Sequence, residues 1–419
     1  MIKKIKNIYK IFGPGILMAT AAIGGSHLVS STQAGALFGW SLAIFILLIN
    51  FFKYPFFLAN VQYTMATKKS LIEGYASLGN SWLWLFTILA VIAAVVNTAA
   101  VSMFAASLLG YFIPIKLTIN ILSFIIIFAC ILILIAGKYN LLNNVSKIIM
   151  ITLSIATVVA VVMAVTKDVN STLTDDFISP SAWTIASLGF IVILTGWMPA
   201  PIEISSISSI WLKNQIKQTN INAKNALLDF NVGFIVTAIL AIFFLALGAL
   251  VLHGSAYEFK DGIAFSHQLV TMYSTVIGDW SRLLIAFIAF ACMFGTSITV
   301  IDGYGRAVAE AFSLIRKNRS ASNRSVAVWT IFISIIGFLI IIYFASSMRT
   351  MLDFAMILSF TTTPIFAFLN YKLVRSTKLP KELQNGMFLN ILSICGLIFL
   401  FGFLILFIIY RWFPFLIGL

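Results

Sequence analysis

Long apolar runs alternate with short polar connectors along nearly the whole chain. A helix needs about 20 apolar residues to cross the hydrocarbon core of a membrane, and eleven segments of the sequence are long enough. The predicted spans are residues 12–31, 37–64, 81–113, 118–137, 144–166, 181–212, 226–253, 281–314, 325–346, 350–373 and 386–412. The longest connector, residues 254–280, is too short to fold alone. The pattern therefore predicts an all-α membrane protein with one transmembrane domain, residues 1–419.

The composition also indicates a membrane protein, and the positions of the charges argue against nucleic-acid binding. The chain is 61% hydrophobic and only 10% charged, with a net charge of +14, whereas soluble domains are nearer half apolar and a quarter charged. A basic chain could bind nucleic acid, but here Lys and Arg lie mainly in every second connector, as the positive-inside rule expects. We therefore expect the lipid bilayer and a small ion or solute as partners, with no nucleic acid and no obligatory protein partner.

The same connectors predict the orientation. Those on the side of the N-terminus hold most of the Lys and Arg residues, and those on the other side hold few of them but carry six acids: Asp168, Asp175, Asp176, Glu258, Asp261 and Asp279. The N-terminus is therefore predicted to lie in the cytoplasm and the C-terminus outside, in the cell (plasma) membrane. Three cysteines, Cys130, Cys292 and Cys395, lie in separate apolar runs and are interpreted as buried small hydrophobic residues.

Two of the predicted spans are interrupted, five spans apart. Gly24-Gly25-Ser26 breaks the first and Pro199-Ala200-Pro201 breaks the sixth. Because five is odd, the second group of five runs through the membrane in the opposite sense. Interrupted helices at matching positions of two inverted repeats mark the midplane binding site of a secondary transporter. We place the repeats at about residues 11–166 and 181–373, with residues 386–412 as an extra helix.

The breaks themselves predict binding chemistry. Pro199 and Pro201 have no N–H, so the carbonyls of Thr195 and Trp197 lose their usual helical donors. In hydrocarbon such carbonyls must face protein, water or a bound cation. At the first break, the glycine pair permits unusual backbone angles and the close approach of another group.

Glu203 follows the second break at membrane depth. An acid is favoured at a helix N-terminus, but that effect is about 0.3–1 kcal/mol. A carboxylate near the bilayer centre costs roughly 2.5–3.5 kcal/mol or more, so capping alone does not offset the cost and a functional role is favoured.

The stretch "FGPGILMATAAIGGSHLVSSTQAGALFGW" resembles the first helix of the NRAMP divalent-metal transporters, which have eleven helices in a LeuT-like 5+5 inverted repeat. The family's Asp-Pro-Gly-Asn motif falls on Gly24, Gly25, Ser26 and His27. Its Met-Pro-His motif falls on Met198, Pro199 and Ala200, and "DGYGRAVAEAF" echoes its eighth helix. The resemblance covers most of the chain.

The chemical centre departs from the family. Its metal-binding Asp is Gly24, its Asn is His27, and its sixth-helix His, tied to proton movement, is Ala200. Its third-helix acidic pair falls on Asn97 and Ala100. A branch of the family that transports magnesium without protons also lacks much of this proton pathway.

The candidate substrate-binding residues are Gly24, Gly25, Ser26, His27, Thr195, Met198 and Glu203. At the chemical centre the resemblance leaves the Thr195 carbonyl, His27 and Met198, and Glu203 is the candidate replacement for the missing carboxylate. His27, Met198 and Glu203 are the candidate metal ligands. His and Met are soft ligands that favour transition metals over calcium or magnesium.

Two further features have open interpretations. Asp302, Arg306 and Glu310 share one face of a helix at a spacing of four, and form either a charge-compensated ladder or a relay or gate. Lys53 lies mid-span beside Pro55 and could pair with an acid that the sequence does not identify.

The sequence therefore predicts a secondary transporter of NRAMP type that works by alternating access and is not an enzyme. It imports a divalent metal cation such as manganese, iron or magnesium, with weak or absent proton coupling and no cofactor. The alternatives are a LeuT-fold carrier of a small organic solute such as an amino acid, and a degenerate homologue that does not transport.

Overall fold

The computed structural model describes residues 13–136, 139–166, 178–218, 221–254, 260–318 and 320–413, without the side chains of 139–147, 149 and 150. Asp168, Asp175 and Asp176 lie outside these residues. The described chain is helical and contains no strand. Its α-helices are α2 (Pro14–Ala22), α3 (Thr32–Phe38), α4 (Ala43–Thr67), α5 (Leu71–Leu78), α6 (Asn80–Gly110), α7 (Ile119–Ile135), α8 (Tyr139–Thr166), α9 (Leu188–Trp197), α10 (Ile204–Gln218), α11 (Ala223–Val251), α12 (Gly262–Ile277), α13 (Arg282–Ile315), α14 (Asn323–Tyr343), α15 (Met348–Ser376) and α16 (Met387–Trp412).

Each predicted span coincides with one of these helices or with an interrupted set of them. In the described residues seven helices, α4, α6, α11 and α13 to α16, are long and apolar enough to cross a membrane. The first span runs on to Phe38, beyond its predicted end, because a turn comes only at Gly39, where φ is +57°. The short helices α5 and α12 were not predicted. The residue limits of the two repeats remain a prediction.

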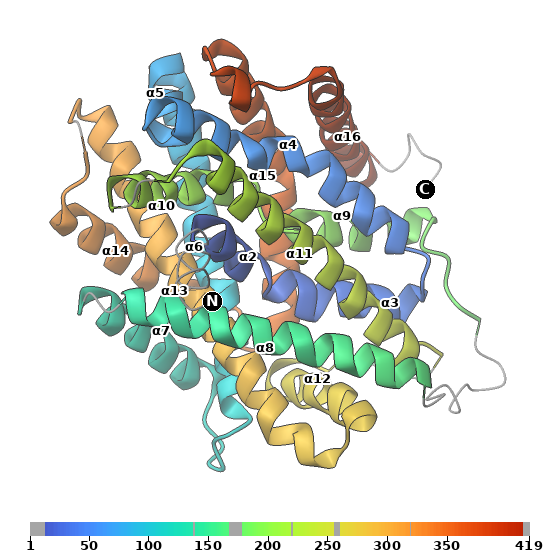
Figure 1. Ribbon diagram of the computed structural model, residues 1–419. Coiled ribbons are helices and arrows are strands. Elements are labelled where there is room, and N and C mark those ends of the chain that lie inside the picture. The colour runs from blue at the N-terminus through green and yellow to red at the C-terminus, as the bar shows by residue number, and fades with distance from the viewer. Residues whose placement is uncertain are drawn as a thin grey trace, which may run out of the picture.

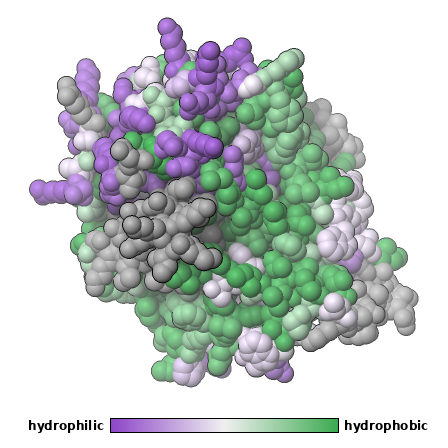
Figure 2. All heavy atoms as spheres, viewed as in Figure 1, coloured by the Kyte–Doolittle hydropathy of each residue, from purple (hydrophilic) through white to green (hydrophobic). Residues whose placement is uncertain are grey.

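The outer surface divides into an apolar flank and a basic end. Large apolar side chains such as Phe124 of α7, Phe332 of α14 and Ile398 of α16 are exposed on the flank, which Figure 2 shows as a broad hydrophobic face with hydrophilic side chains gathered at upper left. Exposed basic residues mark this end of the molecule, which we call the basic end: Lys68, Lys69, Lys217, Arg316, Lys317, Arg324, Arg375 and Lys378. Such a flank is suited to contact with lipid.

The interrupted first helix lies at the centre of the molecule (Figure 1), in contact with α10, α11 and α13. Glycines permit its close packing on α11. A Cβ added to Gly15 would lie 2.3 Å from the carbonyl oxygen of Asp229, and one added to Gly35 would lie 2.0 Å from that of Leu245. The Asp229 carboxylate also accepts from the N–H groups of Gly13 and Gly15, at 3.1 and 2.7 Å, and so caps the start of α2.

The cysteines are only partly as predicted. Cys130 and Cys292 are buried, but Cys395 is exposed. It lies on α16, whose outer face is on the apolar flank, so an apolar run alone did not imply burial.

Candidate functional site

The first break is short and its carbonyls are bonded to protein groups. α2 ends at Ala22, and the π-helix η1 begins at Ser26 and runs to Ser31. The Ala22 carbonyl accepts from Ser26 Oγ at 2.8 Å, and the Ile23 carbonyl accepts from Cys292 Sγ at 3.1 Å. Neither Gly24 nor Gly25 has a positive φ, so the predicted need for unusual backbone angles is not what fixes glycine here.

The two breaks adjoin. The indole of Trp197 packs on Gly25 so closely that an added Cβ would lie 2.5 Å from its ring. Ser26 Oγ also donates to the Pro199 carbonyl at 3.4 Å. Gly25 is therefore required by the close approach of Trp197, the second of the two reasons that the sequence suggested.

The second break spans residues 198–203, between the end of α9 and the start of α10, and its Met198–Pro199 peptide bond is cis. Carbonyls of the break and of the last turn of α9 face a cation that belongs to the protein. Lys53 Nζ donates to the carbonyl oxygens of Thr195 at 2.6 Å, Gly196 at 3.4 Å and Ala200 at 3.5 Å. The freed Thr195 carbonyl predicted from Pro199 is thus satisfied by the ammonium of a residue on α4.

Lys53 is 0% exposed. Glu203 belongs to the same break, but no ion pair within 4 Å joins it to Lys53 in the described chain. A buried charge is tolerated only when it is well compensated. Here the compensation comes from main-chain oxygens at the C-terminal end of α9, which carry partial negative charge.

Glu203 immediately precedes α10 and belongs to a buried polar network. Its Oε1 accepts from the Tyr304 hydroxyl at 3.1 Å, whereas Oε2 is buried and has no hydrogen-bond partner among the described residues. Asn97 Nδ2 donates to Tyr304 at 2.8 Å, and Trp197 Nε1 donates to Asn97 Oδ1 at 3.2 Å and to Ser359 Oγ at 3.0 Å. The network links α6, α9, α13 and α15 to the second break.

A cavity of about 30 Å³ lies between the breaks. Its polar lining comes from Ser26, Asn97, Thr296 and Tyr304, and Trp197 closes one side. This is space for one or two waters or a dehydrated ion. The side chains of His27, Met198 and Glu203 do not line it.

His27 is buried and both of its ring nitrogens have protein partners. Nε2 lies 2.9 Å from the Thr237 carbonyl oxygen, and Nδ1 lies 2.7 Å from Ser26 Oγ. Because a carbonyl oxygen only accepts, Nε2 carries a proton and cannot ligate a metal in this arrangement.

Met198 is also fully buried, in an apolar cluster that includes Phe38, Leu42, Ala241 and Leu245. Its sulfur therefore lies among side chains of α3, α4 and α11, and Trp197 faces the cavity in its place. Metal ligation by His27 and Met198 remains a prediction.

The residues predicted as a ladder or gate divide between two ion pairs. Arg306 Nε pairs with Asp302 at 2.8 Å, one helical turn apart. Glu310 instead pairs with Lys213 of α10 at 3.0 Å, and Lys213 also pairs with Glu73 of α5 at 2.6 Å. Lys213 therefore ties the second half of the sixth span to α5 and α13 at the basic end.

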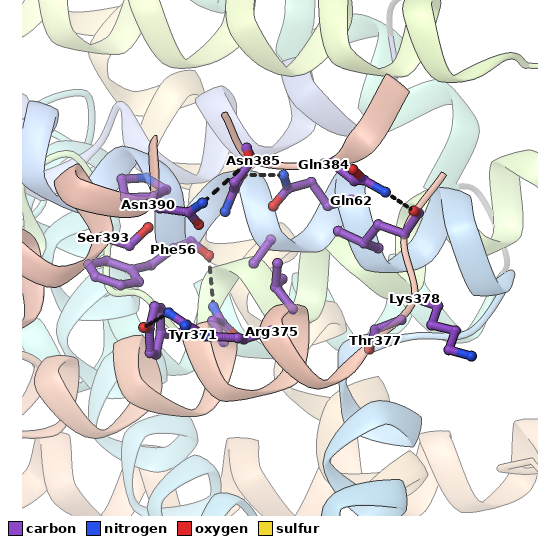
Figure 3. Close-up of a pocket in the computed structure, with 15 residues that line it drawn as sticks. Phe56, Gln62, Tyr371, Arg375, Thr377, Lys378, Gln384, Asn385, Asn390 and Ser393 are labelled. Carbon is purple, nitrogen blue, oxygen red and sulfur yellow. Dashed lines mark hydrogen bonds between the residues drawn. The ribbon is translucent and has the colours of Figure 1, made fainter. Parts of the chain in front are cut away.

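A much larger cavity, of about 690 Å³, opens at the basic end between α4, α15 and the start of α16 (Figure 3). Figure 3 shows Gln62 beside Asn385, to which it donates at 2.6 Å. Asn370 also lines this cavity, and its amide donates to the Phe56 carbonyl at 2.8 Å and to Ser205 of α10 at 2.9 Å. No break residue lines it, so it is separate from the site between the breaks.

The site also contains four residues that the sequence does not predict for it: Lys53, Trp197, Tyr304 and Ser359. Of these four, only Lys53 has a sequence feature that indicates a special role, namely a charge in the middle of a predicted span. Its partners are main-chain oxygens 142 to 147 residues away, which no local pattern identifies.

Comparison with known proteins agrees with this architecture. Residues 15–410 match the family model of the natural resistance-associated macrophage protein-like proteins, Nramp. The chain is 48% identical to the uncharacterized protein PM0681 of Pasteurella multocida (strain Pm70) over 402 residues, 96% of this chain and 92% of that protein.

The solved structures show the fold. A mutant of the Eremococcus coleocola manganese transporter superposes with a TM-score of 0.72 at 15% identity, over 96% of this chain and 87% of that one. The structure of MhsT in complex with L-phenylalanine superposes with a TM-score of 0.64 at 13% identity, over 93% of this chain and 98% of that one. The predicted all-α, LeuT-like fold class is confirmed. Because the family model matches residues 15–410, nearly the whole helical region, the chain belongs to the Nramp family and is a secondary transporter, not an enzyme.

Proposed function

We propose that this Nramp protein carries a divalent metal cation, such as manganese, iron or magnesium, by alternating access. The cation binds in the α9–α10 break, to the Thr195 carbonyl and the Glu203 carboxylate. The supporting observation is that the oxygens of this break already hold a positive charge, the Lys53 ammonium.

The donor set narrows the cargo. The polar groups at the break and its cavity are carbonyl, carboxylate, amide and hydroxyl groups, because the soft ligands His27 and Met198 are engaged elsewhere. Oxygen ligands suit magnesium and manganese better than softer metals. Among the three metals, we therefore favour magnesium and manganese.

The alternative, an amino acid or other small organic solute, has less support. It requires N–H groups of the first break to meet a carboxylate. Those of Gly24, His27 and Leu28 donate within the segment itself. The cavity of about 30 Å³ is also smaller than any amino acid.

Proton coupling through the family's usual positions is not supported. Those positions carry Asn97, Ala100 and Ala200, none of which titrates. We therefore expect weak or absent coupling along that route.

The protein is proposed to lie in the cell membrane with the basic end in the cytoplasm. The support is the charge asymmetry between the two ends of the molecule. In this orientation the Lys213 ion pairs close the cytoplasmic side of the path.

Uptake of Mn²⁺ and Mg²⁺ into liposomes that contain the purified protein tests the function, with an amino-acid panel in parallel. We expect uptake of at least one divalent cation, reduced tenfold or more by Glu203→Gln. The control is Asp279→Asn, which neutralises an exposed carboxylate on the opposite end from the basic one. Uptake of an amino acid without metal would support the organic-solute carrier, and no uptake of either would contradict transport.

A further inference from the structure

Lys53 is the feature of the site that the family resemblance does not explain. An ammonium group has three N–H donors, and Nζ has three carbonyl acceptors, on Thr195, Gly196 and Ala200. Lys53 thus fills the position in which the proposed function places the cargo. The inference below rests on that proposed function.

A purely structural role would not require a charge. The carbonyls need only a donor, and a neutral amide would provide one without burying an ion. A lysine at the centre of a membrane is costly to insert. A cation is expected here if the site must hold positive charge when the cargo is absent.

Glu203 provides the second observation. Its Oε2 is buried with no hydrogen-bond partner in the part of the chain that the structure describes, and the residue is 2% exposed. A permanent ion pair with Lys53 would satisfy this oxygen, but the ammonium is bonded to the carbonyls instead. One carboxylate oxygen of the second break therefore has no partner among the described residues, while the Lys53 ammonium is bonded to the carbonyl oxygens.

Lys53 contacts the break only through its side chain. Its ammonium stands on a flexible four-carbon stem, in contrast to the fixed backbone oxygens that it contacts. Pro55 lies two residues after Lys53 inside α4. Because proline has no backbone N–H, α4 lacks one helical hydrogen bond close to Lys53.

We propose that the Lys53 ammonium is a tethered substitute for the transported cation. It occupies the oxygens of the α9–α10 break in the empty carrier, the cargo binds by displacing it, and it returns when the cargo leaves. The empty carrier can then change conformation without exposing uncompensated carbonyls and the Glu203 carboxylate to the low-dielectric interior.

Calorimetric titration of the full-length protein with MnCl₂ and MgCl₂ tests the proposal. Lys53→Met removes the competing charge and is expected to lower the Kd at least tenfold. Lys53→Gln retains a donor without the charge and is expected to give a smaller gain. Lys69→Met, the same change at an exposed position just after α4, should leave the Kd at the wild-type value.

A gain of affinity distinguishes this role from a structural one, because a variant with a damaged fold loses affinity. A Kd for Lys53→Met equal to or higher than the wild-type value would overturn the proposal while leaving the function intact. Failure of every variant, wild type included, to bind either metal would overturn both.

Transport provides a second readout that does not depend on the absolute Kd. In Lys53→Met, exchange of external for internal metal should persist, whereas net uptake should fall at least tenfold because the empty carrier returns slowly. If net uptake and exchange changed in equal proportion, the proposed role of Lys53 in the return of the empty carrier would be contradicted.

Discussion

The ammonium nitrogen of Lys53 lies 2.6 Å from the carbonyl oxygen of Thr195. In an unbroken helix that oxygen would accept from the N–H of residue 199, and Pro199 has none. A side chain from α4 thus supplies the donor that proline removes from the sixth span. Pro199 breaks the helix, and the Lys53 ammonium compensates the carbonyl oxygen that the break leaves without its helical donor.

The contact between Gly25 and Trp197 is expected to control how the two breaks meet. In Gly25→Ala the new Cβ would lie 2.5 Å from the indole ring, so the breaks must move apart, at a cost of about 1–3 kcal/mol. The melting temperature in detergent and the transport rate should both fall. Gly189→Ala, which adds a methyl group in open space on α9, should change neither.

A double variant, Gly25→Ala with Trp197→Phe, checks the cause. Trp197→Phe alone is the reference, because it also loses the indole hydrogen bonds to Asn97 and Ser359. Gly25→Ala should cost less stability in the Trp197→Phe background than in the wild type, and an equal cost in both would show that the clash with Trp197 is not responsible.

Met198 tests the ligand set predicted from the family motif. Because its sulfur packs in an apolar cluster, Met198→Leu, a swap of similar volume, should cost less than about 1.5 kcal/mol in stability. The Kd for Mn²⁺ should stay within twofold of the wild-type value in a calorimetric titration. A tenfold weaker Kd in a stable variant would instead confirm the thioether as a ligand.

Lys213 is expected to hold the basic end closed. Lys213→Met removes both ion pairs and leaves Glu73 and Glu310 without their shared cation. Hydrogen–deuterium exchange along α10 should rise, since α10 loses its ion pairs to α5 and α13. Lys217→Met, an exposed lysine one turn further along α10, is the matched control. Equal exchange in the two variants would rule out this role for Lys213.

The orientation can be measured on intact cells. In a Cys395→Ser background, which removes the exposed native thiol, a membrane-impermeant thiol reagent should label Asp279→Cys. It should label Lys378→Cys, at the basic end, only after permeabilisation. The reverse pattern would place the basic end outside.

The sequence was sufficient for the fold and for the positions of the breaks, because both depend on local properties. Apolar length indicates the spans, and Pro199 and Pro201 stop a helix wherever they occur. The partners across the site depend on packing between distant segments. Lys53 and Thr195 are 142 residues apart, and Glu310 pairs with Lys213 on another helix, not with Arg306 four residues before it.

Neighbouring residues at the end of α9 show the same limit. The family motif predicts Met198 as a ligand, yet Trp197 is the side chain that faces the cavity. Which of two adjacent side chains points into a site depends on how the chain leaves the helix, and no periodicity extends through a break. The same uncertainty applies to His27, whose ring is bonded to Thr237 of α11.

Anomalous diffraction from crystals of the protein soaked in MnCl₂ tests the central claim most directly. We expect one strong manganese peak at the α9–α10 break, within coordination distance of the Thr195 carbonyl and the Glu203 carboxylate, with Lys53 Nζ moved off the three carbonyl oxygens. A manganese peak elsewhere, with Lys53 Nζ still bonded to Thr195, would contradict it.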